Sequence, residues 1–118
     1  EDERFVKAVQ HIKKGLYHEG LMYRYKAEDD FGVPTSSFTI CTFWLIDALF
    51  MIGEKEEAKE IFENMISYSN HLGLYSEDLD FKSKRQLGNF PQAYSHLAFI
   101  NTAALFSEEK TLSQFIRP

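Results

Sequence analysis

The chain has 118 residues, of which 44% are hydrophobic and 26% charged, a composition typical of a globular domain and not of a disordered segment. Its 13 Lys and Arg residues face 18 Asp and Glu residues, and a net charge of -5 argues against nucleic-acid binding. One cysteine, Cys41, excludes an intramolecular disulfide framework and any multi-cysteine metal site. The chain opens on Glu-Asp-Glu-Arg without a basic and then apolar leader, so we expect a cytoplasmic location.

The first predicted element is an amphipathic helix over residues 3–16. Its apolar residues recur at helical spacing along one face, namely Phe5, Val9, Ile12 and Leu16. Asp2 can cap this helix, and Gly15 can end it in a left-handed turn. A polar loop from about residue 17 to residue 36 follows, and it contains the acidic run Glu28-Asp29-Asp30.

A second helix is predicted to end at Ile52, with Ser36 or Ser37 as its cap. Residues 38–52 are apolar on nearly every side, which predicts a helix buried on every side. The stretch is interrupted by polar residues and is shorter than the roughly 20 residues of a membrane span. We therefore expect a buried helix of a soluble protein, followed by a tight connection at Gly53.

Two further helices complete the predicted pattern. Residues 54–68 carry one apolar stripe on an otherwise charged helix, formed by Ala58, Ile61, Phe62, Met65 and Ile66. This helix should pack as the outer member of an antiparallel hairpin with the second helix. Pro91 is suited to the first position of a mostly apolar inner helix that ends near Phe106, and Ser107 can cap a short terminal helix with Leu112, Phe115 and Ile116. With no strand alternation visible, the chain is predicted to be all-α.

Up-and-down packing of these helices has a consequence for the loops. If inner helices run one way and outer helices return, the loops before the second and fourth helices emerge at the same end. One concave end would then gather six charged residues, which are Arg24, Asp29, Asp30, Glu77, Asp78 and Asp80.

The spacing of these residues leaves several roles open. The loop carboxylates of Glu77, Asp78 and Asp80 fit a general base, a metal ligand, a cap or a solvated charge, and spacing alone favours the last two. Arg24 lies between Tyr23 and Tyr25, a setting that suits sugar hydroxyls because guanidinium donors and ring faces both contact sugars. A loop arginine paired with Asp29 or Asp30 is the simpler interpretation.

Other reactive residues form no recognisable site. The four histidines, His11, His18, His71 and His96, have no metal-binding spacing, although His71 and His96 could approach each other in space. Cys41 lies in the apolar helix and is expected to be a buried small hydrophobic residue. No phosphate-binding loop and no nucleophile elbow are present, so we expect no metal and no cofactor.

Several strings in a fixed order resemble the C-terminal part of the glucoamylase-like glycoside hydrolases of family fifteen, which includes glucoamylases, glucodextranases and microbial trehalases. They begin with Arg24-Tyr25, Asp29-Asp30-Phe31-Gly32 and Cys41-Thr42-Phe43-Trp44-Leu45. They continue with Glu57-Ala58, Phe62-Glu63, Gly73-Leu74-Tyr75-Ser76-Glu77 and Gly88-Asn89-Phe90-Pro91-Gln92-Ala93-Tyr94-Ser95-His96. The resemblance runs from about Leu16 to Phe106, and its last string is the most specific.

The resemblance implies an (α/α)6 toroid that hydrolyses α-linked glucosides with inversion. By the match to its motifs, Glu77 would be the general base, and Arg24 with its neighbour Tyr25 would bind the glucose being cleaved. Inversion needs a second carboxyl group about 6.5–9.5 Å away as general acid. Such acid–base hydrolysis needs no cofactor.

The resemblance also implies that something is missing. The family's general acid comes from earlier in the chain, and no residue here matches it. Residues 1–118 would therefore be a single partial domain, the C-terminal section of a toroid, and would be inactive alone. Uncovered apolar faces on the second and fourth helices predict self-association. The alternatives are a non-catalytic remnant or regulatory module that binds glucan or a partner protein, and an unrelated repeat-type scaffold, against which the lack of a fixed repeat argues.

Overall fold

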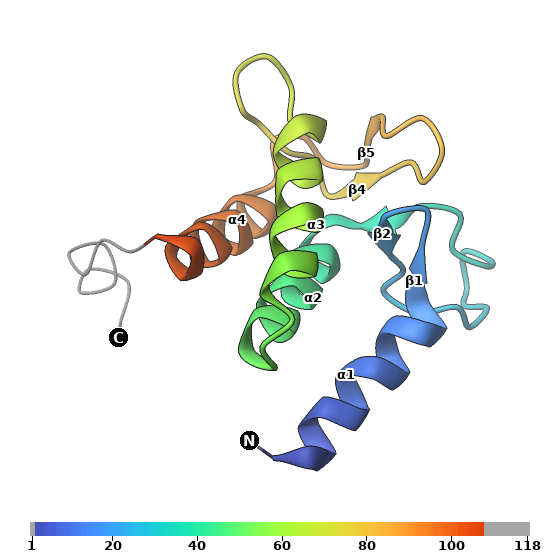
Figure 1. Cartoon of the computed structure of the whole chain (residues 1–118). Coiled ribbons are helices and arrows are strands. Elements are labelled where there is room, and N and C mark those ends of the chain that lie inside the picture. The colour runs from blue at the N-terminus through green and yellow to red at the C-terminus, as the bar shows by residue number, and fades with distance from the viewer. Residues whose placement is uncertain (1, 108–118) are drawn as a thin grey trace.

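The computed structural model describes residues 2–107, and this range contains four helices and five short strands. The helices are α1 (Glu3–Leu16), α2 (Thr39–Met51), α3 (Lys55–Tyr68) and α4 (Ala93–Phe106). Helix α2 is central, because both α3 and α4 pack against it, and α1 contacts it less extensively (Figure 1). The short helix predicted after Ser107 lies outside the described residues.

Two small antiparallel sheets correct the expectation of an all-α chain. The strands β1 (Tyr17–His18) and β2 (Leu21–Met22) form a hairpin. The strands β3 (Ser37–Phe38), β4 (Asp78–Leu79) and β5 (Gln86–Leu87) form a second sheet with β4 in the middle. Strands of two residues are too short to show an alternating pattern in the sequence. Their pairing depends on turns and on contacts between distant segments, so the sequence pattern could not reveal them.

The hairpin turn between β1 and β2 explains one of these missed pairings. Glu19 and Gly20 have φ angles of 48° and 83°, as in the two-residue turns whose twist matches that of antiparallel strands. Glycine adopts this conformation readily, but glutamate rarely does. Glu-Gly is therefore a weaker hairpin signal than Asn-Gly or Asp-Gly.

The bounds predicted for the first helix are confirmed. Of the two residues predicted to begin and end it, only the cap residue Asp2 acts as expected. The Asp2 carboxylate accepts a hydrogen bond of 2.9 Å from the backbone N–H of Arg4 and caps α1 as expected. Gly15 does not end the helix, since α1 continues to Leu16. The chain leaves α1 at Tyr17 in an extended conformation, and the backbone N–H of Tyr17 still donates to the carbonyl of Lys13.

The predicted serine cap of the second helix is wrong. Helix α2 begins at Thr39, and neither serine provides a cap to it. The Ser37 hydroxyl donates to the carbonyl of Leu79 at 2.8 Å, and the Ser36 hydroxyl donates to Asp78. The backbone N–H of Thr39 donates instead to the carbonyl of Glu77 at 3.0 Å. The serines therefore join the start of α2 to strand β4.

The start of the fourth helix also differs from the prediction. Helix α4 begins at Ala93, two residues after Pro91. Gln92 is extended, with φ -109° and ψ 121°, and its backbone N–H donates to the carbonyl of Tyr75 at 3.0 Å. This bond to a distant segment holds residue 92 outside the helix, and proline alone does not signal such a bond.

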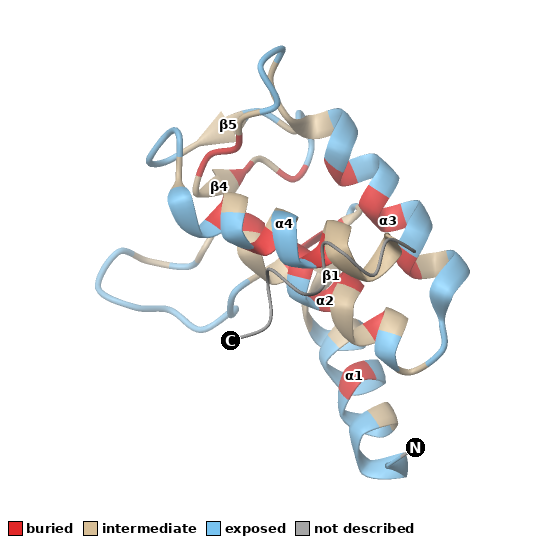
Figure 2. Ribbon diagram, turned by 90° about the vertical axis from the view of Figure 1, so that its left-hand side faces the viewer, coloured by how far each residue is buried: buried red, intermediate tan, exposed pale blue. Residues whose placement is uncertain are grey.

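Burial supports the predicted stripe of α3 but not full burial of the inner helices. Ala58, Ile61, Phe62 and Met65 are buried, whereas Ile66 is exposed. Helix α2 leaves Trp44 and Met51 58% and 59% exposed, and α4 leaves a row of exposed apolar residues formed by Tyr94, Leu97 and Ile100. Exposed segments alternate with buried ones along α4 (Figure 2). None of the described helices is long and apolar enough to cross a membrane.

Candidate active site

The segment that carries Glu77 is held by the buried residues just before it. Tyr75 is 1% exposed, and its hydroxyl donates to the carbonyl of Met65 near the end of α3 at 2.7 Å. The backbone N–H of Tyr75 donates to Nε2 of His96 at 3.2 Å. Since a backbone N–H can only donate, Nδ1 of His96 must carry the proton that it gives to the carbonyl of Gln92 at 2.7 Å. His96 is therefore a structural residue that links Tyr75 to the start of α4.

Ser76 extends this anchorage to α4 and β5. Its carbonyl accepts a hydrogen bond of 2.8 Å from the hydroxyl of Ser95, and its backbone N–H donates to the side-chain oxygen of Gln86 at 2.6 Å. The backbone of Glu77 is then fixed on both sides. Its N–H donates to the carbonyl of Asn89 at 2.8 Å, and its carbonyl accepts from Thr39. Glu77 thus projects from a rigid backbone at the junction of α2, α4 and the second sheet.

Two side-chain amides contact the carboxylate of Glu77. Asn89 Nδ2 and Gln92 Nε2 each donate to Oε2 of Glu77 at 3.3 Å. Gly88 lies on another side, with φ at +74°, and a β-carbon built on it would lie 3.0 Å from Oε1 of Glu77. The side chain of Glu77 is therefore enclosed by the segment 88–92, and the missing side chain at residue 88 leaves the room that it needs.

Arg24 is held by aromatic rings. Its guanidinium carbon lies 5.2 Å from the centre of the Phe38 ring and 5.8 Å from the centre of the Tyr25 ring. Both distances are within the range of cation–π attraction. Within residues 2–107, no ion pair joins Arg24 to an acidic residue, so the interpretation of Arg24 as the partner of Asp29 or Asp30 is wrong.

Arg24 and Glu77 line the same two cavities. The first, which we call the loop cavity, has a volume of about 590 Å³ and is lined by residues between Arg24 and Phe38 together with Glu77 and Asp78. The second, the helix cavity, has about 470 Å³ and is lined by Arg24, Phe38, Ile40, Trp44, Glu77, Gln92, Tyr94 and Ser95. Both volumes are within the range of small-molecule sites, about 300–1,000 Å³. The wall shared by the two cavities consists of Arg24, Phe38 and Glu77.

Tyr25 is tied to the wall of the loop cavity. Its hydroxyl donates to Oδ2 of Asp29, and this hydrogen bond lowers the pKa of the Asp29 carboxyl and raises the pKa of the Tyr25 hydroxyl. Asp29 also accepts from the backbone N–H of Phe31 at 2.9 Å. Phe31 is 98% exposed at the tip of this turn and lines the loop cavity. The ring of Tyr25 therefore lies beside Arg24, while its hydroxyl is already engaged.

Asp78 is the second carboxylate beside Glu77. Partial burial raises the pKa of the Asp78 carboxyl, the hydroxyl of Ser36 opposes this by donating to it at 2.5 Å, and the negative charge of Glu77 raises it further. Asp78 pairs with Phe38 across the second sheet. It therefore forms part of the cavity wall and connects β4 to the start of α2.

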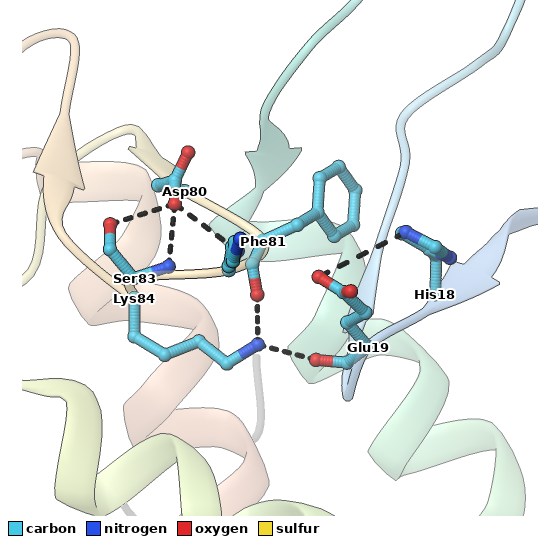
Figure 3. Close-up of polar contacts among 7 residues, drawn as sticks. His18, Glu19, Asp80, Phe81, Ser83 and Lys84 are labelled. Carbon is cyan, nitrogen blue, oxygen red and sulfur yellow. Dashed lines mark hydrogen bonds and ion pairs between the residues drawn. The ribbon is translucent and has the colours of Figure 1, made fainter.

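Asp80 has a structural role outside both cavities. It accepts hydrogen bonds from the backbone N–H groups of Lys82 and Ser83 and from the Ser83 hydroxyl, which lower the pKa of the Asp80 carboxyl (Figure 3). The ammonium group of Lys84 then joins this turn to the β1–β2 hairpin by donating to the carbonyls of Phe81 and Glu19 (Figure 3). Asp80 therefore holds a turn between β4 and β5 and caps none of the described helices.

The cavities contain some of the residues predicted for one concave end. Arg24, Tyr25, Asp29, Glu77 and Asp78 line the loop cavity, whereas Asp30 and Asp80 do not. Sequence reasoning gave no role to Phe38, because its contact with Arg24 is set by the fold. It also gave no role to Asn89 and Gln92, although the string that contains them was recognised.

The described residues contain no cluster of three or more His, Cys, Asp or Glu residues that could hold a metal ion. Cys41 is only partly buried, and burial raises the pKa of its thiol to about 11. A thiol with this pKa is almost entirely protonated at neutral pH and is a poor nucleophile. The side chains that line the two cavities offer carboxylates, a guanidinium group, an amide and aromatic rings.

The arginine donors and the carboxylate at one cavity can bind sugar hydroxyls, and carboxyl groups are what glycoside hydrolysis uses. Comparison with known proteins agrees with this chemistry, since the family model described as glycosyl hydrolases family 15 matches residues 3–104. The chain belongs to this family. No solved structure matches the chain closely enough to count as a relative.

The similar curated proteins are trehalases. The chain is 41% identical to the trehalase of Thermoplasma volcanium over 108 residues, which is 91% of this chain and 17% of that protein. It is 42% identical to the trehalase of Mycolicibacterium smegmatis over 104 residues, 86% of this chain and 16% of that protein. For trehalase 1 of Sulfolobus acidocaldarius the identity is 33% over 95 residues, 80% of this chain and 17% of that protein. The chain spans less than a fifth of the length of these relatives.

Proposed function

We propose that this chain supplies the general base and a sugar-binding arginine for the inverting hydrolysis of an α-linked glucoside. Glu77 is the base, and Arg24 with Tyr25 binds the glucose that is cleaved. The observation that carries the proposal is the wall shared by both cavities, on which Arg24 and Glu77 lie together. Trehalose is the first substrate to test, because the relatives are named trehalases.

The proposed reaction needs one water molecule and two carboxyl groups. Glu77 takes a proton from the water as the water oxygen forms a bond to the anomeric carbon. The bond from that carbon to the leaving oxygen breaks, and a general acid gives the leaving oxygen a proton. No described residue matches the family's general acid, so we expect a segment outside these 118 residues to provide it. The 118-residue chain alone is then expected to be inactive.

Arg24 would bind sugar hydroxyls from a fixed position. Its guanidinium group rests against Phe38 and has no acidic partner within residues 2–107, so its N–H donors are available to a ligand. The aromatic rings beside it offer flat faces of the kind that pack against sugar rings. The sugar-binding Arg24 and the general base Glu77 would then lie on the same cavity wall.

The test uses the whole protein, trehalose, and NMR detection of the initial ratio of α-glucose to β-glucose before the anomers equilibrate. Glu77→Gln should lower kcat by at least about 1,000-fold, because removal of a catalytic carboxylate also removes its proton-transfer step. The matched control is Glu63→Gln, the same change at an exposed position of α3, and it should keep wild-type activity. Inversion turns the attacked glucose into the β-anomer while the leaving glucose stays α, so equal amounts of the two anomers should appear initially. Full activity in Glu77→Gln, or initial release of α-glucose alone, would contradict the proposal.

The alternative function is a non-catalytic module that binds glucan or a partner protein. It predicts trehalose or maltose binding without glucose release, unaffected by Glu77→Gln. Titration of the sugar against the fluorescence of Trp44, which lines the helix cavity, measures binding, and glucose release measured in parallel distinguishes the two functions.

A further inference from the structure

We propose that Asn89 and Gln92 are positioning residues that hold one oxygen of the Glu77 carboxylate and so fix the direction of the other. This inference rests on the proposed function of Glu77 as general base. It assigns a task to the string Gly88-Asn89-Phe90-Pro91-Gln92 beyond its value as a family signature.

The two amides converge on the same atom. Asn89 Nδ2 and Gln92 Nε2 each lie 3.3 Å from Oε2 of Glu77. An ionised carboxylate only accepts hydrogen bonds, so each amide must present its nitrogen. Within residues 2–107, no hydrogen bond reaches Oε1. One oxygen of Glu77 is thus occupied by protein donors, and the other is left to accept a proton from water.

The donors are themselves fixed by the backbone. The carbonyl of Asn89 accepts from the backbone N–H of Glu77 at 2.8 Å, so residues 77 and 89 are joined by main chain and side chain together. The backbone N–H of Gln92 donates to the carbonyl of Tyr75, two residues before the base. Because the amides and the base belong to one hydrogen-bonded unit, the carboxylate has little freedom to rotate.

The chemistry of the donors suits this task. Asn89 and Gln92 are neutral, so they orient the carboxylate without pairing it with a positive charge. Gln92 and Glu77 both line the helix cavity, which places the held carboxylate at the wall that a sugar would touch. A base must be held within a fraction of an ångström of its working geometry, and small displacements are costly for the rate.

The first test measures kcat and KM for trehalose in the whole protein. Gln92→Met keeps the length of the side chain but removes its donor, and Asn89→Ala removes the second donor. Each should lower kcat by about 10- to 100-fold, the cost expected of a misplaced catalytic group. KM should stay within about twofold, because binding of the intact sugar does not need the base to be aligned.

The controls make the same chemical changes elsewhere. Gln10→Met on α1 and Asn64→Ala on α3 are exposed and should keep wild-type kcat. Circular dichroism melting of every variant separates loss of the fold from loss of alignment. A rise in KM with unchanged kcat would overturn the inference, because it would make the amides sugar contacts and not positioning residues.

A double-mutant cycle gives the sharper readout. In a Glu77→Gln background the amides have no base to align, so adding Gln92→Met should leave the residual rate unchanged. The same further loss in both backgrounds would overturn the inference. If Glu77→Gln itself keeps full activity, the proposed function fails. If Glu77→Gln is inactive while Gln92→Met and Asn89→Ala keep wild-type kcat, only the positioning role fails.

Discussion

At the scale of single residues, the site depends on the close approach of Gly88 to Glu77 as well as on its charged groups. Glu77 lies against Gly88, whose φ of +74° favours glycine, and the nearest atoms that a β-carbon there would meet all belong to Glu77. Tyr75, Ser76 and His96 hold the backbone on either side of Glu77 and Gly88 through their hydrogen bonds. The Glu77 carboxylate is therefore placed by the hydrogen bonds of its neighbours.

Gly88→Ala should damage both stability and activity. The new β-carbon would lie 3.0 Å from Oε1 and 3.3 Å from Cβ of Glu77, in a backbone conformation that alanine rarely adopts. The strain should lower the free energy of unfolding by about 1–3 kcal/mol, as measured by urea unfolding. Gly15→Ala on α1 is the control, since nothing lies within 4 Å of its β-carbon position. Equal stability of Gly88→Ala and the wild type would show that the segment relaxes freely.

At the scale of elements, α2 and α4 are joined by one polar contact within an apolar interface. The hydroxyl of Thr102 donates to Oδ1 of Asp47 at 2.6 Å. Burial raises the pKa of the Asp47 carboxyl, and the hydrogen bond from Thr102 partly offsets this effect. Aromatic contacts continue the packing, with Phe43 lying edge-on to Phe99 of α4. The ionised carboxylate of Asp47 is therefore a cost to the folded state at neutral pH.

Asp47→Asn should stabilise the protein at pH 7 and not in acid. Because folding raises the pKa of Asp47, its contribution to stability is fully present below the ordinary value of 3.8 and is lost as the pH rises through the folded-state pKa. Asparagine keeps the Oδ1 acceptor for Thr102 and carries no charge. We expect a gain of about 0.5–1 kcal/mol at pH 7 in urea unfolding, disappearing near pH 3.5. Asp30→Asn, at an exposed position, is the control; a loss of stability at pH 7 would contradict this account.

At the scale of the whole molecule, much apolar surface is left uncovered within the described residues. The exposed residues lie on α1, α2 and α4 and include Phe5, Ile12, Trp44, Met51, Tyr94, Leu97 and Ile100. Exposed apolar side chains that gather into patches mark interaction surfaces on soluble proteins. The chain spans less than a fifth of the length of its relatives.

The 118-residue chain should therefore self-associate when it is isolated. Size-exclusion chromatography with light scattering should give a mass above 13.8 kDa that rises with concentration. Leu97→Lys combined with Ile100→Lys should shift the mass toward that of the monomer, because both residues lie on the exposed face of α4. Asn101→Lys adds a charge at a polar, exposed position of the same helix and should change little. A stable wild-type monomer at all concentrations would contradict the expectation.

The sequence by itself determined the helices and the residues worth testing. The periodic apolar residues of α1 and α3 place those helices to within a residue, because a 3.6-residue period depends only on neighbours along the chain. The motifs pointed to family 15 and to Glu77 and Arg24, whose catalytic and binding roles stay predictions. These signals involve residues that are near one another in the sequence, so they can be recognised without knowledge of the fold.

Only the tertiary structure decided how distant segments meet. The serines before α2 bind β4 and do not cap the helix, and Gln92 is held outside α4 by the carbonyl of Tyr75. Phe38 becomes the surface on which Arg24 rests, and Asn89 and Gln92 converge on Glu77. Each of these contacts joins residues far apart in the chain, and a hydrogen bond between such residues leaves no periodic trace in the sequence.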